Sequence, residues 1–226
     1  MIASLQFADV GRAQAARLLA LPPRPGEHGL RHAAVGVAVP LSGKLLPSPS
    51  LRRVGLLAFW EDDEAAQSFL ERSPIGEALA GGWRSRLEPL RVWGSWPGVP
   101  AELQRARHTA YQGPTVVVTL GRLRLSQTAR FLRASSRAEA EVLDAPGLVW
   151  ATGLARPPFV CTCSLWRSVA DMSAYAYDHD GAAHPAAIAE DRAKPFHRQS
   201  AFIRFRPYEI TGSLAGRSPL RAGALP

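Results

Sequence analysis

Apolar and polar positions divide the first half of the chain into short blocks. Residues 54–60 are apolar without interruption over the length of one strand, which is typical of a strand buried on both faces. Asp62 follows this block and can cap a helix, since the next two residues are acidic and favour a first helical turn. The first half therefore predicts strand, helix, strand, strand, helix and strand, at 4–7, 10–19, 31–40, 54–60, 62–70 and 86–96.

The second half predicts the same order of elements. Ser126 can cap a helix that ends before the segment Asp-Ala-Pro-Gly, because serine favours the N-cap and proline cannot continue a helix. Ser168 and Asp171 have the spacing of a capping box, with aspartate in place of the usual glutamate or glutamine. The expected elements are strand, helix, strand, strand, helix and strand, at 114–125, 126–143, 148–154, 159–166, 168–177 and 201–211.

An internal repeat relates the two halves. The segments PLRVWGSWPG (89–98) and PYEITGSLAG (207–216) share proline, glycine, serine and glycine at matching places, and LAFW (57–60) matches CSLW (163–166). The tryptophans lie 106 positions apart (166 − 60) and the prolines 118 (207 − 89), so about twelve residues are inserted in the second half. We expect the insertion at 178–195.

The doubled βαββαβ order predicts an α+β fold of tandem duplicated ferredoxin-like units. Each unit would form an antiparallel sheet with helices on one face, and the two sheets would form a domain of the dimeric α+β barrel type. Strands that close around a space can enclose an apolar ligand, so we expect a cavity bounded by strands. The expected division is an N-terminal half at 1–98, a linker at 99–113, a C-terminal half carrying the site at 114–216 and a flexible tail at 217–226.

Composition and charge narrow the classes of function. The chain has 226 residues, 46% of them hydrophobic, and no apolar run reaches the roughly 18 residues of a membrane helix. The net charge is +8, but the arginines are scattered along the sequence without interleaved aromatic residues, so we do not expect a nucleic acid partner. The N-terminus lacks the pattern of a signal peptide. We expect a soluble cytoplasmic protein, with peripheral membrane contact left open.

Several chemistries are excluded by the motifs. The sequence contains no GxSxG, GxGxxG or Walker motif. Cys161 and Cys163 are the two cysteines, and their spacing places both on one face of a strand. Two thiols alone cannot build a metal centre, and buried structural cysteines are the expected outcome.

His184 is the main candidate for chemistry. It lies in the inserted segment, and Pro185 suits the first position of a helix, so His184 would stand at the mouth of a short helix that ends near Pro195. A helix N-terminus disfavours imidazolium, and a neutral imidazole is the form that binds haem iron. The alternative is a polar capping residue in solvent. His179 and His197 are weaker candidates for the same role.

A block in the C-terminal half carries a family resemblance. It comprises WRSVADMSAYAY (166–177), His184 followed by Ala187 and Ile188, then Arg192, Phe196, FIRFRP (202–207) and Gly212-Ser213. In the first half, Trp60, Trp83, EPL (88–90) and GSW (94–96) occur in the corresponding order. Over roughly residues 2–216 the chain resembles the spheroidene monooxygenase family.

The resemblance implies a haem-dependent monooxygenase that adds a hydroxyl or keto group to an apolar isoprenoid such as an acyclic carotenoid. It implies dioxygen as co-substrate, a redox partner such as ferredoxin, and His184 as the iron ligand. Arg192 and Arg204 would pair with the haem propionates, because arginine matches carboxylates, or would be surface arginines. Four aromatic side chains would line the pocket or pack the core: Trp166, Tyr175, Tyr177 and Phe196.

The sequence also departs from the family pattern. Phe196 stands where the family pattern has tryptophan, Leu214 replaces an aromatic residue after Gly-Ser, and the first half is short before Arg53. The missing residues before Arg53 would shorten a loop, and a shorter loop could mean a smaller or different substrate. Two other functions stay open: a cofactor-free oxygenase or isomerase with an α+β barrel, and a non-catalytic protein that binds haem or a small apolar ligand. A monomer and a homo-oligomer both stay open, because duplication can supply the barrel interface within one chain.

Overall fold

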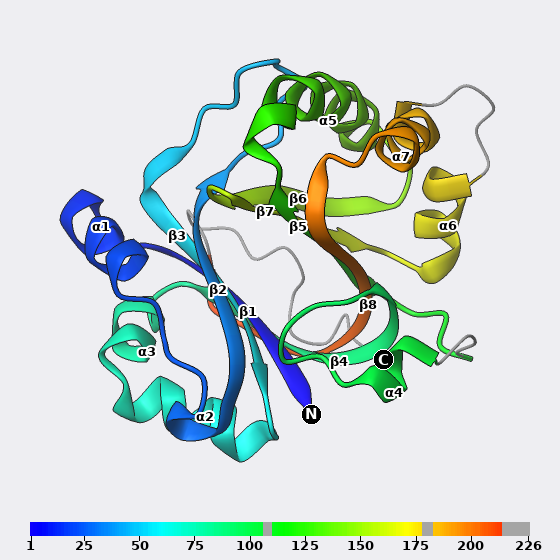
Figure 1. The fold of residues 1–226 in the computed structure, drawn as a ribbon. Helices are drawn as coiled ribbons and strands as arrows, with labels where there is room; N and C mark the ends of the chain where they lie inside the picture. Colours follow the sequence, from blue (N-terminus) through cyan, green and yellow to red (C-terminus); the bar gives the residue numbers. More distant parts are fainter. Residues whose placement is uncertain (106–109, 178–182, 214–226) are drawn as a thin grey trace.

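A computed structural model describes residues 1–105, 110–177 and 183–213 (Figure 1). The first half contains β1 (Ile2–Asp9), α1 (Arg12–Ala20), η1 (Glu27–Gly29), β2 (Leu30–Val39), β3 (Ser50–Trp60), α2 (Asp63–Arg72), α3 (Pro74–Leu79) and β4 (Trp83–Gly94). The second half contains β5 (Thr115–Leu123), η2 (Leu125–Gln127), α5 (Thr128–Leu143), β6 (Leu148–Arg156), β7 (Phe159–Trp166), α6 (Val169–Tyr177), α7 (Ala183–Ala193) and β8 (His197–Thr211). Between them lies α4 (Ala101–Arg105).

The strands form one closed antiparallel barrel in the order β1-β3-β2-β6-β7-β5-β8-β4. The first half contributes β2-β3-β1-β4 and the second β6-β7-β5-β8, which is the same internal order. The pairs β2–β6 and β4–β8 join the two halves at the seams. The predicted fold of two ferredoxin-like units in one barrel is therefore confirmed.

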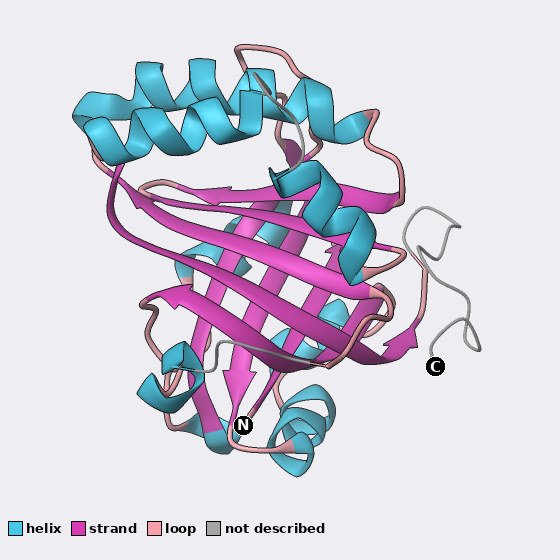
Figure 2. Cartoon of the chain, turned by 90° about the vertical axis from the view of Figure 1, so that its right-hand side faces the viewer, coloured by secondary structure: helices cyan, strands magenta, loops and turns pink. Residues whose placement is uncertain are grey.

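The helices lie outside the barrel in two groups. α1, α2 and α3 cover the strands of the first half, and α5, α6 and α7 cover those of the second half on the other side of the molecule (Figure 1). α5 and α7 pack against each other, and Figure 2 shows them lying across the top of the sheet. Within the described ranges, no helix is long and apolar enough to cross a membrane.

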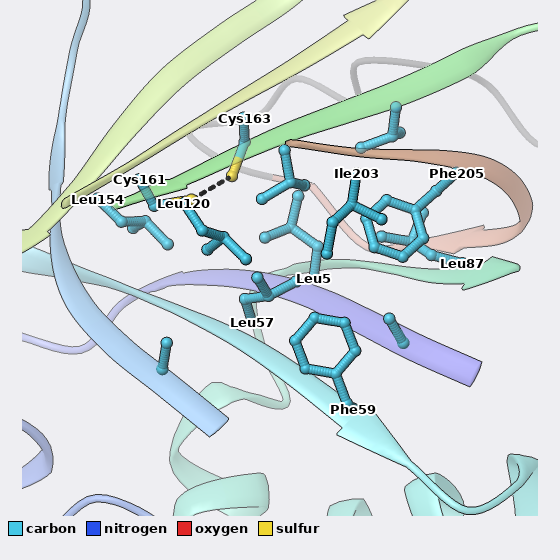
Figure 3. Packing of buried hydrophobic residues seen from close by; sticks show 14 of the residues in the cluster. Leu5, Leu57, Phe59, Leu87, Leu120, Leu154, Cys161, Cys163, Ile203 and Phe205 are labelled. Atoms are coloured by element: carbon cyan, nitrogen blue, oxygen red, sulfur yellow. Dashed lines mark hydrogen bonds between the residues drawn. The ribbon is translucent and has the colours of Figure 1, made fainter. Parts of the chain in front are cut away.

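Side chains from both halves fill the interior of the barrel (Figure 3). Leu57, Leu120 and Phe205 are fully buried there. Cys161 and Cys163 also point inward from β7, as their spacing predicts, with their Sγ atoms 3.5 Å apart. Burial raises the pKa of the Cys161 thiol. A barrel of eight strands is just wide enough for its own side chains. The apolar cavity described below is bounded by strands on one side only, because it lies outside the barrel.

Two glycines of the internal repeat occupy equivalent backbone positions. Gly94 at the end of β4 has φ 78°, and Gly212 after β8 has φ 74°, a region that favours glycine. A Cβ atom at Gly94 would collide with the carbonyl oxygen of Ser200, and one at Gly212 with the carbonyl oxygen of Gly82. The shared glycines thus let two chain segments approach closely at matching places in the two halves.

Two of the three predicted helix N-caps are present in the structure. Asp62 caps α2, since its side chain accepts a hydrogen bond from the Ala65 amide at 2.8 Å. Ser168 caps α6 by accepting from the Asp171 amide at 3.0 Å, while the shorter Asp171 side chain accepts from the Ser168 hydroxyl at 2.6 Å. The predicted cap at Ser126 was wrong, because Ser126 lies inside the 3₁₀ turn η2 and α5 begins two residues later.

The predicted insertion at 178–195 contains the whole of α7. This helix has 11 residues, whereas the corresponding α3 in the first half has six. Residues 178–182 of the predicted insertion and the tail at 217–226 lie outside the described residues. The insertion therefore adds a longer helix to the layer that covers the second sheet.

Candidate functional site

A cavity of about 560 Å³ lies between the second half of the barrel and its helices. Its floor consists of side chains that point out of the barrel, such as Thr119 of β5 and Ser164 of β7. Its roof includes Ala134 and Ala138 of α5 together with residues of α6 and α7. Because small side chains face each other from floor and roof, the two layers leave a space of the size that small-molecule sites have.

The equivalent layer of the first half is filled. Leu18 of α1 and Phe69 of α2 are buried against the outer face of the sheet, where Trp60 packs on Phe69 with ring centroids 4.9 Å apart. Duplication thus produced two helix layers over two similar sheets, and the second layer contains the cavity. This difference identifies the C-terminal half as the specialised copy.

Trp166 and Tyr175 form one wall of the cavity. Their rings stack with centroids 5.2 Å apart, and the Trp166 indole N–H donates to the Ser164 hydroxyl at 2.9 Å. Trp60 in the first half makes the same kind of bond, to Ser4 at 2.9 Å. Burial, and to a lesser degree the neighbouring Glu141, raise the pKa of Tyr175, so its phenol stays neutral. Trp166 is 2% exposed and therefore contributes to the core as well as to the wall.

Arg204 is a buried cation at the edge of the cavity. It points out of the barrel from β8 and is only 7% exposed. Its Nη2 donates to the Met172 sulfur at 3.9 Å, and its guanidinium carbon lies 5.8 Å from the centre of the Trp93 ring. Met172 and Trp93 both line the cavity. Arg204 is therefore one side chain away from the cavity wall.

One nitrogen of the Arg204 guanidinium has no hydrogen-bond partner in the described part of the chain. Its Nε atom is buried without a hydrogen-bond partner, and no carboxylate among the described residues forms an ion pair with it. Burial lowers the pKa of Arg204, because a charged group loses hydration there. A buried cation with no carboxylate partner in the described ranges fits a site whose ligand carries a carboxylate or another anionic group.

His197 provides an imidazole at the other end of the cavity. Its Nδ1 lies 3.4 Å from the Asp191 Oδ1 of α7, at a geometry that makes no ordinary hydrogen bond. The same carboxylate oxygen accepts the Phe196 amide at 2.7 Å, which fixes its position. Burial lowers the pKa of His197, and the proximity of Asp191 opposes that shift only in part. The imidazole is therefore neutral near pH 7.

A β-bulge places His197 in the cavity. β8 pairs with β5 at Gln199–Arg122 and then at His197–Leu123, so one residue of β8 is skipped. Without this irregularity, alternation would put His197 on the same face as Ala201 and Ile203, which point into the barrel. Simple periodicity therefore misses this residue, and no signal in the sequence alone marks the bulge.

The predicted site residues are distributed around this cavity. Trp166, Tyr175, Tyr177, Arg192 and Phe196 line it, although Arg192 and Tyr177 are largely exposed. Phe196 is 3% exposed and packs its ring on Phe131. The structure therefore brings the five together at one cavity.

The histidines named in the sequence analysis have different outcomes. His184 belongs to the first turn of α7, as its spacing predicts, but its side chain is not among those described. His179 lies outside the described residues. In the part of the chain that is described, no group of three His, Cys, Asp or Glu side chains could hold a bare metal ion.

Two curated proteins resemble the chain over most of its length. The spheroidene monooxygenase of Rubrivivax gelatinosus is 33% identical over 201 residues, which cover 86% of this chain and 75% of that protein. The spheroidene monooxygenase of Cereibacter sphaeroides is 23% identical over 180 residues, which cover 77% of this chain and 55% of that protein. No protein-family model matches the sequence.

Solved structures share the fold at low sequence identity. The aldoxime dehydratase OxdRE, solved in complex with butyraldoxime, matches with a TM-score of 0.53 and 8% identity over 92% of this chain and 79% of that chain. At this identity the similarity establishes the fold alone. The architecture of the chain is therefore one that known enzymes also use.

Proposed function

The chain belongs to the spheroidene monooxygenase family, and we propose that it is a haem-dependent monooxygenase whose site is the cavity between the second sheet and α5, α6 and α7. The observation that carries the proposal is Arg204, a buried cation beside this cavity with no carboxylate partner in the described chain. The proposed substrate is an apolar isoprenoid such as an acyclic carotenoid.

Two features of the described residues fit haem, namely the cavity and two arginines near it. The cavity has a volume of about 560 Å³ and is lined mainly by apolar side chains, which suits a flat apolar macrocycle. Buried Arg204 would neutralise one propionate, and exposed Arg192 would pair with the other. His184 in the first turn of α7 is the proposed iron ligand. When bound, haem supplies the activation of dioxygen.

His197 has a different role in this proposal. It lines the cavity from the first residue of β8, with the Asp191 carboxylate beside its Nδ1. A neutral imidazole can accept a proton from solvent and release it into the cavity, and Asp191 stabilises the cation that forms in between. We assign His197 to the delivery of the protons that the reduction of dioxygen consumes.

The net reaction balances with an external source of electrons. One oxygen atom of dioxygen enters a C–H bond as a hydroxyl group, and the other leaves as water, with the uptake of two electrons and two protons. A second hydroxylation at the same carbon followed by loss of water gives a ketone. Apolar walls such as Phe202 and Val142 exclude water from the C–H bond that reacts.

An absorption spectrum tests the proposal. Protein expressed with a haem precursor should show a Soret band, and His184→Ala should shift or abolish it. His197→Ala is the matched control and should retain the iron ligation. A protein that stays colourless after reconstitution with haem would overturn the proposal in favour of a cofactor-free oxygenase or isomerase. If His197→Ala rather than His184→Ala removes the band, the assignment of the ligand is wrong.

Turnover separates an enzyme from a binding protein. The haem-loaded protein should consume oxygen and form a hydroxylated product from an acyclic carotenoid when a reductant is supplied. His197→Gln should lower this rate by about tenfold to a hundredfold with the Soret band unchanged, because general acid–base catalysis contributes effects of at least that size. Haem binding without any product would favour the non-catalytic alternative.

A further inference from the structure

The reaction proposed above needs electrons from another molecule. The sequence contains no GxGxxG fingerprint for a dinucleotide. If the proposed function holds, an electron carrier that serves this site would dock on the surface of this chain. The docking surface should lie close to the cavity and should be chemically distinct from the rest of the surface.

One surface next to the cavity is strongly basic. We call it the basic face and define it by Arg122, Arg124, Arg130, Lys194 and Arg198. These residues are scattered in sequence but meet where β5 ends, α5 begins and β8 starts. The Arg124 Nε donates to the His197 carbonyl at 3.2 Å, and the Arg130 Nη1 donates to the Lys194 carbonyl at 3.2 Å. Backbone hydrogen bonds thus hold two of the cations in place.

The charge of the basic face is uncompensated. None of its five cations forms an ion pair with a carboxylate of the described residues. The nearby acids are engaged elsewhere, because Glu190 pairs with Arg137 and Asp191 faces His197. Cations that pair with no carboxylate of the described ranges produce a positive potential at this surface, which attracts acidic macromolecules.

The basic face is also concave. Arg122 and Arg198 flank a surface depression of about 630 Å³, whose lining includes Pro158 and Leu125. Leu125 is 67% exposed and supplies an apolar side chain within this depression. A concave surface with cations at the rim and an apolar anchor fits a protruding acidic segment of a protein. A flat bilayer would contact the rim without filling the depression.

The basic face and the cavity share a wall one residue thick. The guanidinium of Arg130 lies 4.9 Å from the centre of the Phe196 ring, and Arg124 contacts the backbone of His197. Phe196 and His197 line the cavity from their other side. A redox group docked on the basic face would therefore be separated from the cavity by a single layer of side chains.

We propose that the basic face is the docking site of an acidic electron-carrying protein. The inference rests on the proposed function, since a protein that consumes no electrons needs no such partner. Charge complementarity brings the two proteins together, and Leu125 in the depression provides a desolvated contact. The short path through Phe196 and His197 makes this surface suitable for electron delivery.

Binding of a plant-type [2Fe–2S] ferredoxin is the test, with the haem-loaded full chain as the partner. Raising NaCl from about 20 mM to about 300 mM should weaken the dissociation constant by about tenfold or more, because surface charges are screened. Arg122→Glu combined with Arg198→Glu should weaken binding at low salt by a similar factor. Both arginines are exposed and lie outside the proposed haem site, so the Soret band should not change.

The matched control reverses the same number of charges elsewhere. Arg24 and Arg72 are exposed residues near the helices of the first half, and Arg24→Glu with Arg72→Glu should change the affinity less than about twofold. An equal loss of ferredoxin affinity in both double variants would show that the basic face is not the docking site. Tighter binding of the basic face to vesicles containing anionic lipid than to ferredoxin would also contradict the proposal. If the protein takes up haem but R122E/R198E leaves its affinity for ferredoxin unchanged, the proposed docking site is wrong and the proposed function is unaffected. A protein that takes up no haem overturns the proposed function instead.

Discussion

The guanidinium of Arg204 donates to the sulfur of Met172 at 3.9 Å and makes no ion pair with any carboxylate of the described chain. A thioether is a weak acceptor, so it replaces little of the hydration that the cation loses on burial. Within the described ranges, burial of this cation is therefore poorly compensated. In the proposed function, the ligand supplies the anion that pairs with it.

Replacement of Arg204 should affect stability and binding in opposite directions. Arg204→Met removes the buried charge and keeps most of the volume, so the free energy of unfolding of haem-free protein should stay equal or rise by about 1–2 kcal/mol. Haem affinity should fall by about tenfold or more, because a charge-assisted hydrogen bond is lost. Urea unfolding and haem titration measure the two effects.

Arg206→Met is the control for Arg204→Met. Arg206 lies two residues further along β8, is more exposed and pairs with Glu88 at 3.4 Å. Its replacement should change neither quantity beyond about 0.5 kcal/mol, as is usual for exposed ion pairs. If Arg204→Met destabilises the haem-free protein by several kcal/mol, the cation has a partner that supports the fold and its assignment to a ligand is wrong.

The contrast between the two helix layers predicts opposite effects of the same substitution. Ala138→Leu on α5 adds volume at the cavity, so the stability of the ligand-free protein should be unchanged or slightly higher. Ala66→Leu on α2 adds the same volume to a filled layer, where overpacking should cost about 1–3 kcal/mol. Thermal unfolding compares the two variants directly.

The same two substitutions should also differ in their effect on haem binding. Ala138→Leu should reduce haem uptake strongly because it narrows the cavity, whereas Ala66→Leu should leave uptake unchanged in the fraction that folds. Equal uptake by Ala138→Leu and the unmodified chain would show that the ligand binds elsewhere.

His32 should make the stability of the protein depend on pH. Burial, and secondly the charge of Arg122, lower the pKa of His32 to about 4. The unfolded chain, with a histidine pKa of about 6.5, therefore binds a proton before the folded chain does as the pH falls. The contribution of His32 is fully present above about pH 6.5 and is lost between about pH 6.5 and pH 4. Because His32 is partly exposed, we expect a loss of about 1–2 kcal/mol after allowance for solvent screening.

Two variants isolate this contribution. In His32→Gln, the free energy of unfolding should decline less between pH 6.5 and about pH 4 than in the unmodified chain, by the amount given above. Arg122→Gln should show an intermediate decline, because it removes the second cause of the shift and keeps the burial. Urea unfolding at several pH values provides the measurement, and identical curves for all three chains would contradict the prediction.

The paired glycines Gly94 and Gly212 should be equally intolerant of a side chain. Either substitution by alanine forces a positive φ on a residue with a Cβ atom and a collision with a backbone carbonyl, at a cost of about 1–3 kcal/mol. Gly81→Ala is the control, because a Cβ at Gly81 would meet nothing within 4 Å. It should change stability by no more than about 0.5 kcal/mol. Chemical denaturation measures the free energy of unfolding of the three variants. The prediction is wrong if Gly81→Ala lowers this free energy the most.

Local sequence determined much of the architecture. Asp62 marks the start of α2, and the repeat that pairs Trp60 with Trp166 predicts two equivalent units. These predictions succeed because helix caps, strand periodicity and buried anchors depend on residues close together in the chain. The place of α7 followed in the same way, from the difference in spacing between the two copies.

Tertiary structure alone decided where the cavity lies and what surrounds it. Closure of the barrel let inward side chains from both halves fill its interior, so the free space arose outside, between small residues such as Thr119 and Ala138. A bulge that only strand pairing reveals turned His197 toward that space. Arginines that look scattered in sequence, such as Arg122 and Arg198, meet at one surface. Each of these features depends on contacts between residues far apart in the chain, which a periodic pattern does not encode.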